Sequence, residues 1–321
     1  MRFSESREQL EFAASLGDLL AKADTPATVR AWAAGDYGRG RALWGRLADQ
    51  GVLALGLPER YGGYGATPVD LVLAFEQLGR AAVPGPLVES IAVLPRLLAG
   101  TSAAPRLEKV GTGQLMATVA MPPRVPYALD GAAADELYVV AGTAVSRAAA
   151  AAPVASVDPA RRLTAVTAGE SLGRVDPNDA FDLGALCTAA QVLGAGQALL
   201  ERSSEYALQR SQFGKPIGSF QAVKHLLADV MVALDLARPL LFGAALAIGT
   251  PTQARDVSAA KVACSDAAYL ASRNGLQVHG AIGYTQEYDL SLWLTKVRAL
   301  YSAWGTQAEH RARVLHALVG T

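Results

Sequence analysis

The peptide from Arg210 to Gln221, Arg-Ser-Gln-Phe-Gly-Lys-Pro-Ile-Gly-Ser-Phe-Gln, brings together groups that could hold a dinucleotide. Arg210 offers a planar fork of donors that stays charged and suits two phosphate oxygens. Gln212 and Gln221 add amides, and Phe213 adds a ring that could lie beside an aromatic base. The alternatives are a surface arginine near a helix end and a phenylalanine that is buried as an anchor of the turn. We call residues 210–221 the 210 turn.

A second segment, Gln277 to Tyr284, reads Gln-Val-His-Gly-Ala-Ile-Gly-Tyr and places glycines where a helix is expected to end. Gly280 and Gly283 would let backbone amides approach a nucleotide closely. Gln277, Gly280 and Gly283 are therefore candidate binding residues. His279 is expected to be a packed or hydrogen-bonded histidine rather than a catalyst.

Helical patterns at both ends of the chain must position these segments. Residues 1–105 predict an N-terminal helical domain, in which Thr67-Pro68-Val69-Asp70 starts a helix with a hydroxyl cap, a proline and a carboxylate. Residues 181–321 predict a helical bundle with one helix ending near Arg210 and another spanning Ala254 to Asn274, closed by Gly275. Two antiparallel helical pairs in this region imply a four-helix layer.

Residues 106–180 have a different character. Leu137–Val140 and Leu163–Thr167 are short β-prone runs, and the alanine-rich stretch Ala148–Ala152 is interpreted as a connector. The predicted fold class is therefore mostly α-helical with a small central β domain.

The composition narrows the function classes. The 321 residues include 29 Lys and Arg and 29 Asp and Glu, so no excess of charge indicates nucleic acid or an acidic membrane surface. No uninterrupted apolar run approaches the roughly 20 residues that span a bilayer. Cys187 and Cys264 lie in apolar helical patterns without a metal-spaced cluster, which favours a reduced, cytoplasmic protein without a metal. The apolar fraction of 51% suggests that some of the surface is buried against other subunits.

Taken together, four stretches resemble the flavin-dependent acyl-CoA dehydrogenases. Leu57–Gly63, followed by Phe75–Arg80, is similar to the N-terminal domain of that family. The 210 turn resembles its C-terminal signature, and Gln277–Tyr284 resembles its Gln-x-x-Gly-Gly-x-Gly-(Phe/Tyr) segment, with Ala281 in place of the second glycine. Gly305-Thr306 matches the end of its Glu-Gly-Thr motif.

The resemblance implies a helical, β, helical order, an acyl-CoA substrate and FAD as the cofactor. It also implies which residues contact that FAD: Arg210, Gln212, Phe213, Gln221, Gln277, Gly280, Gly283 and Thr306.

The residue that would remove a proton from the substrate is missing. In this family a glutamate abstracts the proton next to the thioester carbonyl while the flavin takes a hydride from the next carbon. Its usual position, before Gly-Thr, is occupied here by Trp304, which has only an N–H donor. The second position that the family uses corresponds to Gly184. The sequence therefore predicts no catalytic residue, with Glu309 expected in a capping box and His310 on a solvated helix face.

The β region also lacks the Thr-Glu-Pro loop and the Trp-Ile-Thr strand that contact the flavin ring in this family, and no tryptophan occurs between Arg106 and Ala180. In the family each FAD straddles two subunits, and the residues retained here belong to the pyrophosphate and adenine share. The chain thus resembles the non-catalytic subunit of an α2β2 enzyme for bulky substrates such as steroid side-chain CoA thioesters. A homologous partner would supply the glutamate. Trp304 would then fill the space that the glutamate occupies in other members of the family.

Two alternatives remain open at this point. The chain could be a homo-oligomeric flavoenzyme with a relocated base such as Glu309 or His310. It could also be a helical scaffold protein that has lost flavin binding.

Overall fold

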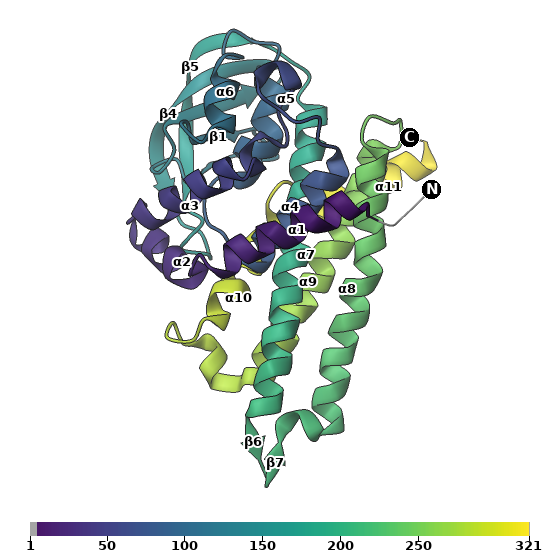
Figure 1. The fold of residues 1–321 in the computed structure, drawn as a ribbon. Helices are drawn as coiled ribbons and strands as arrows, with labels where there is room; N and C mark the ends of the chain where they lie inside the picture. The colour runs from purple at the N-terminus through teal and green to yellow at the C-terminus, as the bar shows by residue number, and fades with distance from the viewer. Residues whose placement is uncertain (1–4, 321) are drawn as a thin grey trace.

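The computed structural model describes residues 5–320, and Figure 1 shows three parts that follow one another along the chain. Short helices come first, a small sheet follows, and long helices complete the molecule. This order confirms the predicted fold class, mostly α-helical with a small central β region. The domain boundaries near residues 105 and 180 stay a prediction.

The N-terminal part is built from short helices whose starts are specified locally. Thr67 accepts from the backbone N–H of Asp70 while the Asp70 carboxylate accepts from the Thr67 N–H, so both halves of a capping box are formed. Pro68 takes the first helical position, which confirms the predicted helix start. The helices are α1 (Arg7–Ala21), α2 (Thr25–Ala34), α3 (Gly38–Asp49), α4 (Pro68–Arg80), α5 (Leu94–Leu98) and α6 (Arg106–Gly111).

The sheet contains β1 (Ala117–Ala120), β2 (Ala128–Leu129), β3 (Glu136–Ala141), β4 (Ala144–Val154) and β5 (Leu163–Arg174) in the spatial order β1-β3-β4-β5-β2. Strand β1 pairs with β3 in parallel, and the other neighbours are antiparallel. The interpretation of Ala148–Ala152 as a connector is wrong, because this stretch lies inside β4. Alanine has a low strand propensity, and it is the hydrogen-bonded partners β3 and β5 that hold the stretch extended.

The C-terminal part is a bundle of long helices. Its elements are α7 (Asn178–Gln209), the hairpin strands β6 (Ser211–Gln212) and β7 (Lys215–Pro216), α8 (Gln221–Ala247), α9 (Gln253–His279), the 3-10 turn η5 (Gly280–Tyr284), α10 (Leu290–Ser302) and α11 (Gln307–Val319). Helix α9 does not end at Gly275 as predicted; Gly280 is its C-cap, with φ 65°. Gly275 instead lies inside the helix, where an added Cβ would be 3.0 Å from Ser203 Oγ of α7. Close helix packing thus explains this glycine.

Helix α7 forms the centre of the molecule and packs against α4, α9 and α10. Its contact with α4 depends on two glycines. A Cβ on Gly79 would be 2.0 Å from the carbonyl oxygen of Gln191, and one on Gly194 would be 2.0 Å from that of Glu76. The two backbones therefore approach each other more closely than any side chain would allow.

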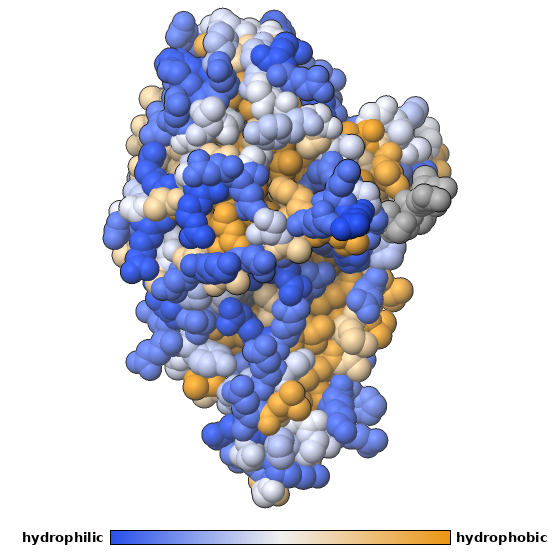
Figure 2. Space-filling model, viewed as in Figure 1, coloured by the Kyte–Doolittle hydropathy of each residue, from blue (hydrophilic) through white to orange (hydrophobic). Residues whose placement is uncertain are grey.

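Helix α8 contacts the rest of the bundle with one face only. Figure 2 shows apolar side chains gathered along the right-hand side of the molecule, over α8. Met231, Val232, Leu236 and Leu240 are between 49% and 69% exposed there. Helices α7 and α8 are both long and apolar enough to cross a membrane, but α7 is a core helix whose most apolar window is 89% buried. The exposed side of α8 is thus an apolar patch on the surface of the described chain.

Candidate functional site

The 210 turn projects from the lower end of the bundle as a small hairpin (Figure 1). Phe213 and Gly214 form its tip in the left-handed region, with φ 53° and 79°. The Phe213 side chain is 92% exposed, so the alternative of a buried anchor is wrong. Its only aromatic neighbour among the described residues is Phe220, at 6.2 Å between ring centres.

The polar groups of the 210 turn are free to meet a ligand. Arg210, Gln212 and Gln221 are exposed, and within residues 5–320 their side chains donate to no protein acceptor. Gln221 is also the first residue of α8, whose N-cap residue Phe220 provides no side-chain acceptor. The N–H groups of the first turn therefore lack a side-chain cap. They follow closely on Ile217, whose N–H donates to the Arg210 carbonyl at 2.8 Å, and a helix start near an arginine suits a phosphate.

The segment around Gln277 lies at the same end of the bundle. His279 is 5% exposed and stacks on Tyr206, one helical turn before Arg210, at 4.2 Å between ring centres. Its Nδ1 donates to the Gly275 carbonyl at 2.8 Å, and burial lowers the pKa of the ring. The prediction of a packed, hydrogen-bonded histidine is confirmed. Gln277 and Gly280 next to it are exposed, whereas Gly283 is buried.

Thr306 is the one candidate that the fold does not bring to this end. It caps α11, and His310 of α11 contacts Ser258 Oγ at 3.1 Å near the start of α9. Ser258 and Gln277 are nineteen positions apart in that helix, which corresponds to roughly 28 Å. Thr306 therefore belongs to a second group of residues at the other end of α9.

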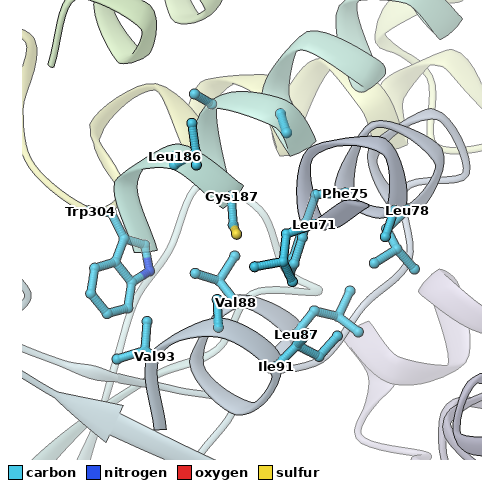
Figure 3. Close-up of a cluster of buried hydrophobic side chains, with 14 of the residues drawn as sticks. Leu71, Phe75, Leu78, Leu87, Val88, Ile91, Val93, Leu186, Cys187 and Trp304 are labelled. Carbon is cyan, nitrogen blue, oxygen red and sulfur yellow. The ribbon is translucent and has the colours of Figure 1, made fainter. Parts of the chain in front are cut away.

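This second group is centred on Trp304 and Gly184, the two positions where the base was sought. Trp304 is 2% exposed, and a Cβ on Gly184 would be 2.5 Å from its ring carbon Cε3. Figure 3 shows the indole beside α7, next to a cluster of apolar side chains that includes Val88 and Val93. Trp304 itself has φ 56°, in the left-handed region. The two positions are thus one place in space, and the indole occupies it.

Glu309 and His310, the two residues considered as a relocated base, both form structural contacts. Glu309 forms the predicted capping box with Thr306, whose N–H donates to Glu309 Oε2 at 2.7 Å. Burial raises the pKa of this carboxyl, but the hydrogen bonds from Thr306 outweigh that effect and lower it. The carboxylate thus holds a helix start together.

The expectation that His310 lies on a solvated face is wrong, since its side chain is fully buried. Its Nε2 donates to the Trp304 carbonyl at 2.9 Å, which leaves Nδ1 to accept from Ser258 at 3.1 Å. Burial lowers the pKa of the ring to about 4. Because both nitrogens are occupied, neither is available to take a proton from a substrate.

Two charged residues beside Trp304 were not predicted from the sequence. Glu89, 2% exposed, accepts from the indole Nε1–H at 3.2 Å, and burial raises the pKa of its carboxyl. Arg161, 8% exposed, lies near it and tends to lower that pKa. Both line a pocket of about 810 Å³ between the sheet and helices α10 and α11. The signal for Glu89 was a single charge in the apolar run from Val88 to Val93, whereas Arg161 carries no local signal.

Family models match most of the chain. The acyl-CoA dehydrogenase N-terminal domain matches residues 6–106, and the acyl-CoA dehydrogenase C-terminal domain matches residues 173–319.

Individual relatives extend over nearly the whole length. Acyl-CoA dehydrogenase IpdE2 of Mycobacterium tuberculosis is 36% identical over 296 residues, which cover 91% of each chain. Among solved structures, the ChsE4-ChsE5 complex from Mycobacterium tuberculosis superposes with a TM-score of 0.85 at 21% identity, covering 100% of both chains. The Tcur3481-Tcur3483 steroid ACAD does so with a TM-score of 0.85 at 21% identity, covering 98% of both. This chain belongs to the acyl-CoA dehydrogenase family of FAD-dependent flavoproteins.

Proposed function

We propose that this chain is the non-catalytic subunit of a hetero-oligomeric acyl-CoA dehydrogenase. The observation that carries the proposal is the Trp304 indole, which fills the place of the family base over Gly184 while the 210 turn at the other end stays exposed. A relocated base receives no support, because Glu309 and His310 are engaged in hydrogen bonds within the protein. The proton would be removed by a glutamate of a homologous partner subunit.

In this assembly the chain would hold the pyrophosphate and adenine end of an FAD whose ring lies in the partner. The bound flavin would accept the hydride from the acyl-CoA. Arg210 would face the phosphates together with the free N–H groups that begin α8, and the exposed Phe213 ring would lie against the adenine. Residues proposed for this end are Arg210, Gln212, Phe213, Gln221, Gln277, Gly280 and Gly283. Thr306 could contact a flavin only at the opposite end of the bundle.

The residues near Trp304 do not fit a flavin ring in the same chain. The indole occupies the space beside Gly184, and the carboxyl of Glu89 is buried beneath it. The two halves of the proposed FAD site would then lie at opposite ends of α9, and this separation supports a site shared between subunits.

The partner would cover the exposed apolar side of α8. Met231, Val232, Leu236 and Leu240 lie on that side and would be removed from water by a second chain. The ChsE4-ChsE5 and Tcur3481-Tcur3483 complexes, each named for two components, favour a hetero-oligomer, with α2β2 as the proposed stoichiometry. The steroid description of the second favours a bulky acyl-CoA substrate. The buried free thiols of Cys187 and Cys264 are in keeping with the cytoplasm.

Co-expression with a candidate partner tests the proposal. Flavin absorbance and dehydrogenation are expected in the complex only, with half as many flavins as subunits. Arg210→Ala should weaken FAD retention by about tenfold or more, because a charge-assisted contact to phosphate is lost. The exposed Arg7→Ala on α1 is the matched control and should leave flavin content unchanged.

Each alternative has its own outcome. Flavin and activity in the chain alone would identify a homo-oligomeric enzyme. Absence of flavin with every homologous partner would identify a scaffold protein. Unchanged flavin content in Arg210→Ala would show that this arginine does not hold the cofactor.

A further inference from the structure

Arg161 is a largely buried arginine that lines the pocket beside Glu89 and Trp304. Its side chain is 8% exposed, and within residues 5–320 its guanidinium forms no ion pair and no hydrogen bond with the protein. Burying a charge without compensation is strongly unfavourable. Such a residue is expected where a ligand supplies the missing charge.

Two carboxylates near Arg161 are engaged elsewhere. Asp158 lies 3.4 Å from the Lys296 ammonium, and both side chains of this pair are 2% exposed. Asp130 accepts from the backbone N–H of Arg162 at 3.0 Å, and burial raises the pKa of its carboxyl to about 7. Neither carboxylate is bonded to the Arg161 guanidinium.

Burial raises the pKa of the third carboxyl, Glu89, while the positive charge of Arg161 acts in the opposite direction. One of its oxygens accepts from the Trp304 indole, and the other has no hydrogen-bond partner in the described part of the chain. Glu89 therefore forms neither an ion pair nor a hydrogen bond with the Arg161 guanidinium in the described part of the chain.

The pocket that Arg161 lines has the size of a small-molecule site, at about 810 Å³. Its walls are largely apolar, with Val125, Pro126, Leu129, Val157, Leu163 and Trp304 among the lining residues. Arg124 and Arg298 also line it and are exposed, so they add positive charge where the pocket meets solvent. An apolar cavity with one buried cation suits a ligand that is both apolar and anionic.

We propose that this pocket binds a small amphipathic carboxylate, with its carboxylate on Arg161 and its apolar body against Trp304 and the neighbouring walls. The planar guanidinium fork matches a carboxylate in two parallel hydrogen bonds. A single buried cation compensates the one negative charge of a carboxylate, whereas the second charge of a phosphate monoester would find no other buried cation among the lining residues. The site lies at the opposite end of α9 from the 210 turn and does not depend on flavin binding.

Calorimetric titration of the full chain tests the site with hexanoate, octanoate and cyclohexanecarboxylate as probes and their primary amides as neutral controls. At least one acid should bind about tenfold more tightly than its amide. Arg161→Met, which keeps the length of the side chain without the charge, should remove this preference by weakening the acid about tenfold. Arg162→Met is the matched control: its side chain is exposed and donates to the Ala33 carbonyl, and the preference for the acid should persist.

The stability of the variant separates ligand binding from a structural role. Removing an uncompensated charge should leave the melting temperature of Arg161→Met unchanged or raise it. A fall of several degrees, together with an unchanged preference for the acid, would show that Arg161 is structural and would overturn the proposal. Tighter binding of hexyl phosphate than of all three acids would overturn the assignment of a carboxylate, and so would the absence of binding by every acid up to about 10 mM.

Discussion

At the scale of single residues, the indole of Trp304 packs directly against the backbone of Gly184, so the two residue types depend on each other. A tryptophan at position 304 needs the space that a missing side chain leaves, and Gly184 provides it in the first turns of α7. The indole then donates to the buried Glu89 instead of leaving its N–H unpaired. Trp304 thus serves packing in this chain.

Gly184→Ala should therefore lower the free energy of unfolding by about 1–3 kcal/mol, because its Cβ would overlap the indole. Urea-induced unfolding measures the change. Gly45→Ala in α3 is the matched control: nothing lies within 4 Å of the added Cβ, and alanine should stabilise the helix by up to about 1 kcal/mol. In a Trp304→Leu background the penalty at position 184 should shrink, and an equal penalty in both backgrounds would contradict the pairing.

The burial of His310 predicts how the stability of the fold depends on pH. Its pKa of about 4 in the folded chain lies below the ordinary value of 6.5, so folding favours the neutral ring. The stability that this gives is fully present above about pH 6.5 and is lost as the pH falls toward about 4, at about 1.4 kcal/mol per unit. His310→Gln should lose this dependence, so its difference from the wild type should change by about 2 kcal/mol between pH 7 and pH 5.

Urea unfolding at the two pH values measures this difference, and comparison with the wild type cancels the contributions of other groups such as His279, whose pKa is also lowered by burial. The exposed His225 provides the control: His225→Gln should keep the wild-type pH dependence. A His310→Gln profile parallel to the wild type would mean that the ring is not held neutral.

At the scale of elements, helix ends determine where the candidate residues lie. The capping box of Thr306 and Glu309 starts α11 directly after Trp304 and Gly305, and so sets the direction in which the chain leaves the indole. Gly305 has φ 100°, a conformation that requires glycine in this connection. The capping box thus helps to position Trp304 and Thr306, which line the pocket of about 810 Å³.

Thr306→Ala should cost about 1 kcal/mol of unfolding free energy, because the N–H of Glu309 loses its acceptor. Thr306→Ser keeps the hydroxyl and should remain close to the wild type. Thermal and urea unfolding of the two variants measure the cap. Equal losses in both would instead indicate that the methyl group of Thr306, rather than its hydroxyl, stabilises the helix start.

At the scale of the whole molecule, the 210 turn lies at one end of α9 and the pocket beside Trp304 lies at the other. Helix α8 packs along α9, and its outer side is apolar and is not covered by any other part of the described chain. The composition already indicated such a surface, and Figure 2 places it over α8. Under the proposed function, a partner subunit would cover this surface and supply the missing part of the active site.

Leu236→Glu should weaken association with the partner by about tenfold or more, because a charge would be buried in an apolar interface. Leu236 is 69% exposed, so the chain itself should fold normally. Co-purification and light scattering measure the assembly, and circular dichroism verifies the fold. Leu10→Glu on α1, where the leucine is 54% exposed, is the control and should assemble normally. Normal assembly of Leu236→Glu would place the partner on another surface.

The sequence by itself determined the features that depend on neighbours along the chain. The fold class, the helix start at Thr67, the capping box at Thr306 and the polar groups of the 210 turn follow from local patterns, because caps and turns are made within a few residues. The prediction that the chain lacks a catalytic base also rests on residue types alone, since no tryptophan side chain can accept a proton from carbon.

Only the tertiary structure decided what depends on distant partners. Ala148–Ala152 became a strand through β3 and β5, and α9 continued past Gly275 because α7 lies close there. His310 was buried by contacts with Ser258 and Trp304, and Arg161 came to line a pocket beside Glu89 from more than seventy positions away. Burial and charge compensation are properties of the packed chain, so no local pattern could have revealed them.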